Sequence, residues 1–143
     1  MRFLIINGPN LNLLGKREPN IYGTNTYEAL CTLIRQDAEQ HGDHVSFFQS
    51  NHEGAIIDMI QQVDGRFDGI VINPGAYSHY SYAIHDALRS IDAPAVEVHI
   101  SDISTREPWR QISVTAPACC GMIMGHGFAG YLEAMERLRE ETC

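Results

Sequence analysis

Short apolar runs of strand length recur along the chain and alternate with segments of helical periodicity. Residues 3–6 (Phe-Leu-Ile-Ile) and residues 69–72 (Gly-Ile-Val-Ile) are continuous runs, each followed by an asparagine and then by glycine and proline. Runs of this kind are typical of strands that are buried on both faces of a parallel sheet. Their alternation with helical segments predicts an α/β fold built from strand–helix–strand units.

The same pattern gives the order of the elements. We expect a flavodoxin-like, doubly wound, five-stranded parallel sheet with helices on both faces. No repeat, low-complexity tract or linker interrupts the 143 residues, so we expect a single domain covering residues 1–143. The expected strands are residues 2–7, 44–49, 69–72, 95–99 and 120–124. The expected helices are residues 25–40, a helix that begins near residue 53, residues 78–89 and residues 128–139, with an irregular polar segment at residues 101–117.

Charge and hydropathy limit the classes of partner. The net charge of −8 argues against a broad basic surface for nucleic acid, although a local group of arginines can still bind a small anion. No apolar run approaches the ~20 residues that cross a bilayer. The N-terminal residues also lack the pattern of a secretory signal. These features predict a cytoplasmic protein with no membrane or nucleic-acid partner.

The four cysteines do not form a metal-binding set. Cys31, Cys119, Cys120 and Cys143 lack the spacing of metal ligands. Buried, reduced thiols are the favoured interpretation, with a vicinal disulfide at residues 119–120 or a redox role as the alternative. His79 and His85 are also poorly spaced to share one metal ion, so we expect no metal.

Polar residues collect where the expected strands end. Asn10 follows the first strand, residues 49–52 (Gln-Ser-Asn-His) follow the second, residues 73–79 follow the third, and residues 99–101 (His-Ile-Ser) follow the fourth. The carboxyl edge of a parallel sheet is where ligands bind in such folds, and it favours anions. Each asparagine taken singly is explained as well by a turn or a helix cap. Together they predict a binding site at this edge.

One strand end carries a candidate acid–base group. His99 closes an apolar strand in which Glu97 lies two residues earlier. A carboxylate can fix the tautomer of a histidine and leave the other ring nitrogen for proton transfer. The alternative is a hydrogen-bonded core histidine, and the spacing alone leaves both open.

The loop after the first strand places an arginine and a tyrosine five residues apart. Arg17 and Tyr22 lie in a Gly/Pro/Asn-rich stretch that ends at Gly23. A free tyrosine has a pKa near ~10, and lowering it to about 7 needs roughly 4 kcal/mol of extra stabilisation of the phenolate. A close guanidinium in a water-poor site can supply much of this. The alternative is a surface loop with a solvated arginine and a packed tyrosine.

Two further motifs each allow more than one interpretation. Arg106 and Arg110 lie four residues apart, so on a helical turn they would share one face and could bind hydroxyls or a carboxylate; the alternative is a solvated turn that pairs with Asp102 and Glu107. Residues 125–130 match G-x-G-x-x-G, but too few residues follow for a dinucleotide-binding unit.

With these residues assembled, the chain resembles the type II 3-dehydroquinate dehydratases. The resemblance extends over nearly the whole length. It rests on residues 7–23 (NGPNLNLLGKREPNIYG), 49–54 (QSNHEG), 72–79 (INPGAYSH) and 96–101 (VEVHIS), with support from Arg106, Glu107, Arg110 and residues 130–132. It implies a lyase that dehydrates 3-dehydroquinate reversibly to 3-dehydroshikimate, with anti stereochemistry, through an enolate and without a cofactor. The implied context is the shikimate pathway or quinate breakdown.

The resemblance also implies catalytic roles. Tyr22 would remove the C2 proton, Arg17 would lower its pKa, and residues 16–24 would form a mobile lid. His99 would protonate the departing C1 hydroxyl, and Glu97 would orient its ring. Asn10 would position the substrate and a water that stabilises the enolate.

Substrate-binding roles follow from the same resemblance. Asn73 would share the function of Asn10, and the backbone amides of Ile100 and Ser101 would bind the carboxylate of this anionic polyol. His79 and Arg110 would hold ring hydroxyls, and Asp86 would reach the site of a neighbouring subunit. Gly75 and Ala76 complete the implied substrate-binding set. The implied assembly is a homododecamer built from trimers.

The chain departs from the family pattern at a few positions. Ser104 and Thr105 stand where a histidine–alanine pair is frequent, and Asp102 replaces a usual asparagine. His85 and Trp109 take positions where arginine and phenylalanine are common. None of these is a proposed proton-transfer residue, so they bear on subunit contacts and lid packing.

Two other functions are compatible with the expected fold. A nucleotide- or flavin-binding protein would use the loop after the first strand for phosphate, but that loop lacks the Ser/Thr-rich composition that suits a phosphate. A non-catalytic assembly or polyol-binding module would keep the asparagines and arginines and would not need Tyr22 or His99.

Overall fold

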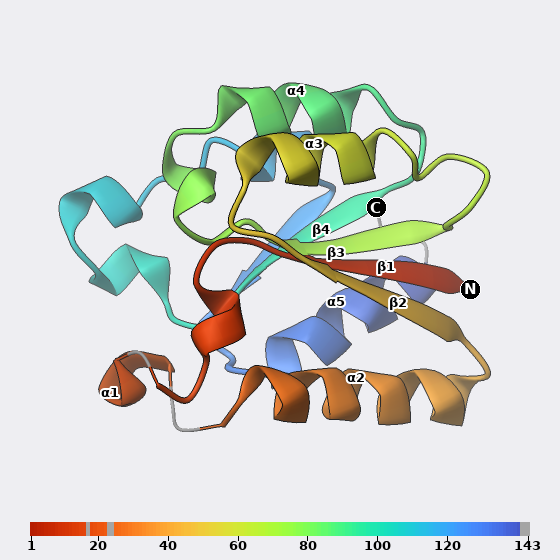
Figure 1. Ribbon diagram of the computed structural model, residues 1–143, viewed down its shortest axis with the longest axis horizontal. Coiled ribbons are helices and arrows are strands. Elements are labelled where there is room, and N and C mark those ends of the chain that lie inside the picture. The colour runs from red at the N-terminus through yellow and green to blue at the C-terminus, as the bar shows by residue number, and fades with distance from the viewer. Residues whose placement is uncertain (17, 23–24, 141–143) are drawn as a thin grey trace.

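A single parallel sheet organises the molecule. The computed structural model describes residues 1–16, 18–22 and 25–140 (Figure 1). The five strands lie in the order β2-β1-β3-β4-β5, and all their pairings are parallel. This order confirms the predicted flavodoxin-like fold. The strands are β1 (Arg2–Asn7), β2 (His44–Gln49), β3 (Gly69–Asn73), β4 (Ala95–His99) and β5 (Gly121–Met124).

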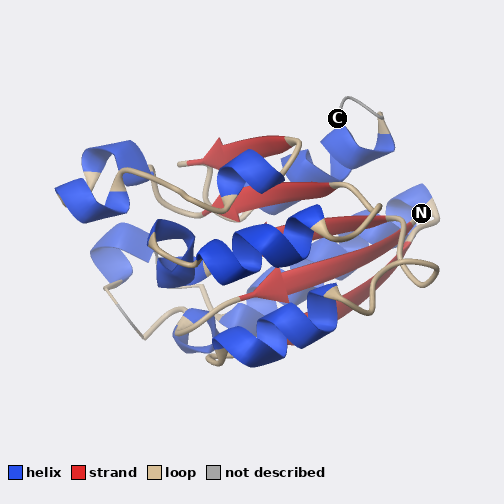
Figure 2. Ribbon diagram, turned by 90° about the horizontal axis from the view of Figure 1, so that it is seen from above, coloured by secondary structure: helices blue, strands red, loops and turns tan. Residues whose placement is uncertain are grey.

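Helices cover both faces of the sheet. Figure 1 shows α3 (Glu53–Ile60) and α4 (Tyr82–Arg89) on one face and α2 (Tyr27–His41) and α5 (Ala129–Arg139) on the other. Figure 2, seen from above, shows α3 and α4 running over the strands. Alternate residues of β1 serve the two layers, because Phe3 and Ile5 pack with α2 and α5 whereas Leu4 and Ile6 pack with α3 and α4. The two cores therefore hold the central strands rigidly from both sides.

The first long helix has the ends that its sequence favours. Thr26 caps α2, since its hydroxyl accepts from the backbone N–H of Ala29 at 3.1 Å. The helix stops at Gly42, whose φ of 72° is a left-handed conformation that glycine adopts without strain. The predicted range of residues 25–40 is therefore confirmed with small shifts at both ends.

The predicted helix at residues 78–89 is wrong in its first turn. The chain forms a 3₁₀ turn over Gly75–His79, and α4 begins only at Tyr82. The hydroxyl of Ser81 accepts from the backbone N–H of Ile84 at 3.1 Å and so starts a new helix. The polar segment at residues 101–117 is irregular, as predicted, and contains the short 3₁₀ turns Ile103–Thr105, Pro108–Arg110 and Ala116–Ala118. A further short helix, α1 (Pro19–Tyr22), lies in the loop after β1.

The cysteines differ from the expectation. Cys31 and Cys119 are free thiols, which excludes a vicinal disulfide at residues 119–120. Cys120 is exposed and disulfide-bonded, so the prediction of reduced, buried thiols is wrong at this position. Among the described residues, no helix is long and apolar enough to span a bilayer.

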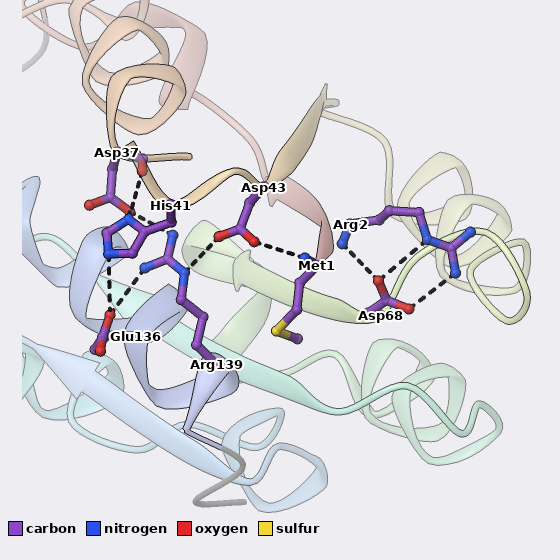
Figure 3. A network of polar contacts seen from close by, with 8 residues as sticks. All are labelled: Met1, Arg2, Asp37, His41, Asp43, Asp68, Glu136 and Arg139. Carbon is purple, nitrogen blue, oxygen red and sulfur yellow. Dashed lines mark hydrogen bonds and ion pairs between the residues drawn. The ribbon is translucent and has the colours of Figure 1, made fainter. Parts of the chain in front are cut away.

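A network of ion pairs fastens the amino edge of the sheet (Figure 3). Arg139 near the end of α5 donates from Nε to Asp43 at 2.7 Å and from Nη2 to Asp37 at 2.8 Å. The other carboxylate oxygen of Asp43 lies 2.8 Å from the amine of Met1. The network therefore joins the start of β1, the turn after α2 and the last turn of α5, at the edge opposite to the site described next.

Candidate active site

A concave pocket lies where the parallel strands end at their carboxyl edge. The pocket is walled by the turns after β1, β3 and β4 and by the irregular segment that follows β4. Its lining comprises Pro9, Asn10, Leu11, Asn73, Gly75, Ala76, His79, His99, Ile100, Ser101, Ile103, Arg106 and Arg110. The structure thus brings together three of the four strand ends whose polar residues suggested a site. The group at residues 49–52 supports the wall from outside, because the side-chain oxygen of Asn51 accepts from the backbone N–H of Asn10 at 3.0 Å.

Glu97 and His99 form a buried pair at the end of β4. They lie two residues apart on one strand, so both side chains point to the same face of the sheet. The Nε2 atom of His99 lies 2.7 Å from a carboxylate oxygen of Glu97, and the side chains are 6% and 0% exposed. Because a carboxylate can only accept, Nε2 donates and Nδ1 is the ring nitrogen left for another partner. The pair fixes both the ring and its tautomer.

Two hydroxyl groups hold the carboxylate of Glu97 from the other side. Ser113 Oγ donates at 2.6 Å to the oxygen that His99 uses, and Thr115 Oγ1 donates to the second oxygen. A buried carboxylate needs such donors, because burial without hydrogen bonds is costly. Sequence reasoning missed Ser113 and Thr115. Their spacing of two residues, which puts them on one side of an extended chain, was the available signal.

His79 faces His99 across the pocket. The two rings are nearly parallel, with centroids 6.4 Å apart. His79 Nδ1 lies 2.9 Å from the carbonyl oxygen of Ile112, so it donates there and leaves Nε2 free of its proton. Burial lowers the pKa of His79 below its ordinary value. The bond to Ile112 raises the pKa, whereas the neighbouring His99 and Arg110 lower it further. A neutral His79 can accept a hydrogen bond from a ligand hydroxyl.

Arg106 and Arg110 supply positive charge on the outer wall. Their side chains are only 10% and 14% exposed. Arg106 donates to Ser101 Oγ at 3.2 Å, and Arg110 donates from Nε to Glu107 at 2.8 Å. The guanidinium of Arg110 also lies 4.0 Å from the ring centroid of Trp109. The carboxylates of Glu107 and Glu18 offset part of this charge, so the two guanidinium groups suit an anion mainly through their directed N–H donors.

The turns after β1 and β3 are pressed together to form the floor. Gly8 donates its N–H to the carbonyl oxygen of Asn73 at 2.8 Å, and Asn73 Oδ1 accepts from the N–H of Gly75 at 3.1 Å. Gly75 has a φ of +62°, and Asn10 has a φ of +69°. The left-handed conformation of Asn10 turns the chain so that this residue lines the pocket.

Four expected site residues are not placed in the pocket lining. Glu97 is fully buried and contacts the site only through His99. Arg17 lies outside the described residues. The backbone of Tyr22 belongs to α1, and its side chain lies outside the described part. Asp86 is exposed on α4 and is not among the lining residues. The segment around α1 is nevertheless tied to the pocket, because the carboxylate of Glu18 lies 3.7 Å from Arg106.

The departures from the family pattern have local explanations. Asp102 accepts from the N–H of Ser104 at 3.0 Å and so caps the 3₁₀ turn that follows β4. The Nδ1 atom of His85 lies 2.8 Å from the carbonyl oxygen of Val114. Trp109 is 54% exposed and meets the ring of His79 edge-on at 5.5 Å. Of these contacts, the one between Trp109 and His79 supports the pocket wall directly.

The arrangement combines an oriented imidazole, a second imidazole that favours its neutral form, two guanidinium groups and a floor of amide groups. Such a set can bind an anionic polyol and deliver a proton to a leaving group. Within the described part of the chain, no group of three or more His, Cys, Asp and Glu side chains is arranged to hold a metal ion.

Comparison with known proteins gives one consistent family. The family model described as Dehydroquinase class II matches residues 1–139. The chain is 55% identical over 139 residues to a 3-dehydroquinate dehydratase of Clostridium acetobutylicum, covering 97% of this chain and 96% of that protein. It is 57% identical over 138 residues to one of Lachnospira eligens, covering 95% and 94%. The crystal structure of a type II dehydroquinase from Butyrivibrio crossotus superposes with a TM-score of 0.95 at 54% identity, covering 97% of both chains.

Proposed function

The chain belongs to the class II dehydroquinase family, and on this premise we propose that it is a hydro-lyase that converts 3-dehydroquinate reversibly to 3-dehydroshikimate. The reaction belongs to the shikimate pathway or to quinate breakdown. It removes water across C1 and C2 of a cyclic ketone that also carries a carboxylate and hydroxyl groups. The observation that carries the proposal is the buried Glu97–His99 pair at the carboxyl edge of the sheet. Glu97 holds Nε2 of the imidazole, so Nδ1 is the nitrogen that remains for the substrate.

The pocket fits the chemical groups of this substrate. The carboxylate binds at the backbone N–H groups of Ile100 and Ser101, where β4 ends. The ring hydroxyls bind His79 and Arg110, and Gly75 and Ala76 form the adjoining wall. The positive charge of Arg106 and Arg110 supports binding of an anion here, because charge-assisted hydrogen bonds are about twice as strong as neutral ones.

The reaction proceeds in two proton-transfer steps. Tyr22 removes the C2 proton, and the electron pair of the broken C–H bond moves into the carbonyl group to give an enolate. Arg17 favours the ionised phenol that acts as the base. Asn10 and Asn73 hold the substrate and a water that donates to the enolate oxygen. The enolate then re-forms the ketone and expels the C1 hydroxyl. In this step His99 acts as the imidazolium: its Nε2–H stays bonded to Glu97, its Nδ1 proton passes to the departing hydroxyl, which leaves as water, and the proton that Tyr22 removed returns to Nδ1 through solvent. No redox step and no cofactor is needed.

The segment around α1 acts as the lid of the site. It carries both Arg17 and Tyr22 within residues 16–24. The contact of Glu18 with Arg106 supports this role, because it ties the segment to the pocket wall. Closure excludes water and brings the base to C2. The cytoplasmic location expected from the sequence remains a prediction.

We also propose self-association into trimers that assemble as a dodecamer. Asp86 is exposed on α4, away from the pocket of its own chain, and this placement supports a role at the site of a neighbouring subunit. Mixed assembly tests the role. Asp86→Ala and His99→Ala subunits, each nearly inactive alone, should recover activity when they are refolded together, because some sites then combine an intact His99 with a neighbour's intact Asp86. No recovery in mixed oligomers of confirmed composition would contradict shared sites.

The direct test of the activity uses the purified protein with 3-dehydroquinate and a chelator. We expect the conjugated enone of the product to appear as a rise in ultraviolet absorbance at a rate proportional to protein concentration. Tyr22→Phe should remove this activity while circular dichroism and the unfolding midpoint stay unchanged, because the substitution removes only a phenolic oxygen. No enone from the unmodified protein would refute the proposed function, and an active Tyr22→Phe variant would refute the assignment of the base.

A further inference from the structure

Three buried polar side chains form a chain of hydrogen bonds beneath the pocket floor. Asn7 ends β1 and Asn73 ends β3, and the two residues are paired in the sheet register. Tyr131 projects from α5, and its hydroxyl donates to Asn7 Oδ1 at 2.6 Å and accepts from Asn73 Nδ2 at 3.0 Å. Asn7 and Tyr131 are 0% exposed and Asn73 is 4% exposed. Only Asn73 reaches the pocket lining.

The N–H of Gly75 fixes which group donates and which accepts in each hydrogen bond of this chain. The N–H of Gly75 can only donate, so Asn73 must turn Oδ1 toward it and Nδ2 toward Tyr131. The hydroxyl of Tyr131 then accepts from Asn73 and has its own proton to give to Asn7. Asn7 must therefore present Oδ1 to the phenol. Reversing the amide of Asn73 would set its NH₂ group against the N–H of Gly75, and reversing Asn7 would leave the phenol proton without an acceptor.

The other end of the chain shows which group sets this order. Asn7 Nδ2 is buried and makes no hydrogen bond of good geometry with the described residues, although the phenol of Tyr27 lies close enough to interact with the Asn7 side chain. An unsatisfied buried donor is costly, and the opposite amide orientation would have let Asn7 donate to the phenol instead. The structure keeps the orientation that satisfies Asn73. Burial also raises the pKa of Tyr131, so the phenol retains the proton that the arrangement requires.

We propose that Tyr131 is a positioning residue that holds the amide of Asn73 for the reaction. Its hydroxyl takes one hydrogen of Asn73 Nδ2 and leaves the second hydrogen for the water or substrate group above the floor. Without this acceptor the amide could rotate, and the donor that serves the enolate would lose its fixed direction. The inference rests on the proposed function, in which Asn73 acts at the enolate stage.

The first test is Tyr131→Phe, which keeps the buried ring and removes the hydroxyl. We expect kcat to fall about tenfold to a hundredfold with a much smaller change in KM, because a fixed donor matters most when charge develops. Leu138→Ala is the matched control. Leu138 is buried on the same helix and packs against Gly69, away from both asparagines. This control should lower the unfolding midpoint at least as much as Tyr131→Phe and leave kcat near that of the unmodified protein.

The second test separates positioning from general loosening of the fold. In an Asn73→Ala background, the residue through which Tyr131 acts is gone, so adding Tyr131→Phe should change kcat by less than about twofold. A merely structural role predicts that the two losses multiply. A full multiplicative loss in the double variant, or unchanged kcat in Tyr131→Phe alone, would overturn the proposal.

A spectroscopic test works even if the proposed function fails. The side-chain amide of Asn73 is identified in ¹⁵N-labelled protein as the NH₂ signal that Asn73→Asp removes. Tyr131→Phe should move this signal and bring its two hydrogens toward equal exchange with solvent, whereas Leu138→Ala should not. Lack of dehydration by the unmodified protein would sink the proposed function alone. An unchanged Asn73 amide signal in Tyr131→Phe would contradict the positioning role and leave the proposed function untouched.

Discussion

The carboxylate of Glu97 is the most completely enclosed charged group near the pocket. It accepts hydrogen bonds from His99 on its own strand and from Ser113 and Thr115 in the segment that follows β4. A carboxylate has no hydrogen of its own and can satisfy all of them together. The orientation of the His99 ring therefore depends on a side chain at position 97 that accepts at both oxygens.

Glu97→Gln tests this dependence. A glutamine amide replaces one acceptor oxygen by a nitrogen that carries hydrogens, and this nitrogen would face either a hydroxyl donor or the His99 N–H. We expect kcat to fall at least tenfold in the enone assay, because a misoriented acid loses much of the 10²–10⁴-fold that general acid catalysis contributes. Glu53→Gln is the control, since Glu53 accepts from the Ser81 hydroxyl outside the pocket. Equal activity in both variants would contradict the orienting role.

At this scale the sequence predicted some of the site's contacts and missed others. The adjacency of Glu97 and His99 follows from their positions two apart on one strand, and the structure places them in direct contact. Ser113, Thr115 and Tyr131 come from other segments of the chain than the residues they contact. Their polar roles depend on tertiary packing, which no local pattern encodes.

Among the elements of the fold, the turns after β1 and β3 form the pocket floor. The turn after β1 approaches the turn after β3 so closely that a Cβ atom on Gly8 would collide with the carbonyl oxygen of Pro74 and lie 2.6 Å from its carbonyl carbon. The N–H of Gly8 bonds to Asn73 across the same contact. The position of Asn73 thus depends on a glycine at position 8.

Gly8→Ala should therefore open the floor. Backbone on both sides resists displacement, so we expect a loss of about 1–3 kcal/mol in the free energy of unfolding and a large fall in activity. Gly54→Ala is the matched control in α3, where a Cβ meets nothing within 4 Å. That change should raise stability by about 0.4–1 kcal/mol and leave activity intact. Chemical denaturation of both variants measures the difference, and a stable, active Gly8→Ala protein would contradict the close approach.

The strands and helices were more predictable than the turns. The continuous apolar runs identified β1 and β3, because strands buried on both faces are mostly apolar. The break between the 3₁₀ turn at Gly75–His79 and α4 was missed, since only the capping bond of Ser81 separates them. The helix α1 was missed as well, because its four residues are too few to show periodicity.

The whole molecule divides its polar interactions between two opposite edges of the sheet. The carboxyl edge carries the pocket, and the amino edge carries the network around Asp43 and Arg139 (Figure 3). Burial of Asp43 opposes its ionised form, but hydrogen bonds from the amine of Met1 and from Arg139 outweigh this, so the pKa of Asp43 is lowered below its ordinary value. The two edges can therefore be tested separately.

Asp43→Asn should destabilise the protein without affecting the pocket. We expect a loss of about 1–3 kcal/mol at pH 7 at fixed protein concentration, because the substitution breaks charge-assisted bonds between three elements. A lowered folded pKa means that this stabilisation is complete above the unfolded pKa of about 3.9 and is lost as the pH falls through the folded value. The difference between the two proteins should therefore shrink below about pH 4.

The exposed pair of Arg2 and Asp68 provides the control for this prediction. Asp68 is 41% exposed, so Asp68→Asn should have a much smaller effect on stability at pH 7. Activity at 25 °C should be unchanged in both variants. Equal destabilisation by the two substitutions, or a difference for Asp43→Asn that grows toward low pH, would contradict the network.

In the proposed mechanism the two proton transfers belong to different groups, and one measurement separates them. His99→Ala is incubated with 3-dehydroquinate in D₂O, and deuterium entry at C2 is followed together with formation of the enone. We predict that elimination falls about a hundredfold or more while exchange at C2 continues near the rate of the unmodified protein, because the base on the α1 segment is intact. A parallel fall of both rates would contradict the division of roles on which the proposed mechanism depends.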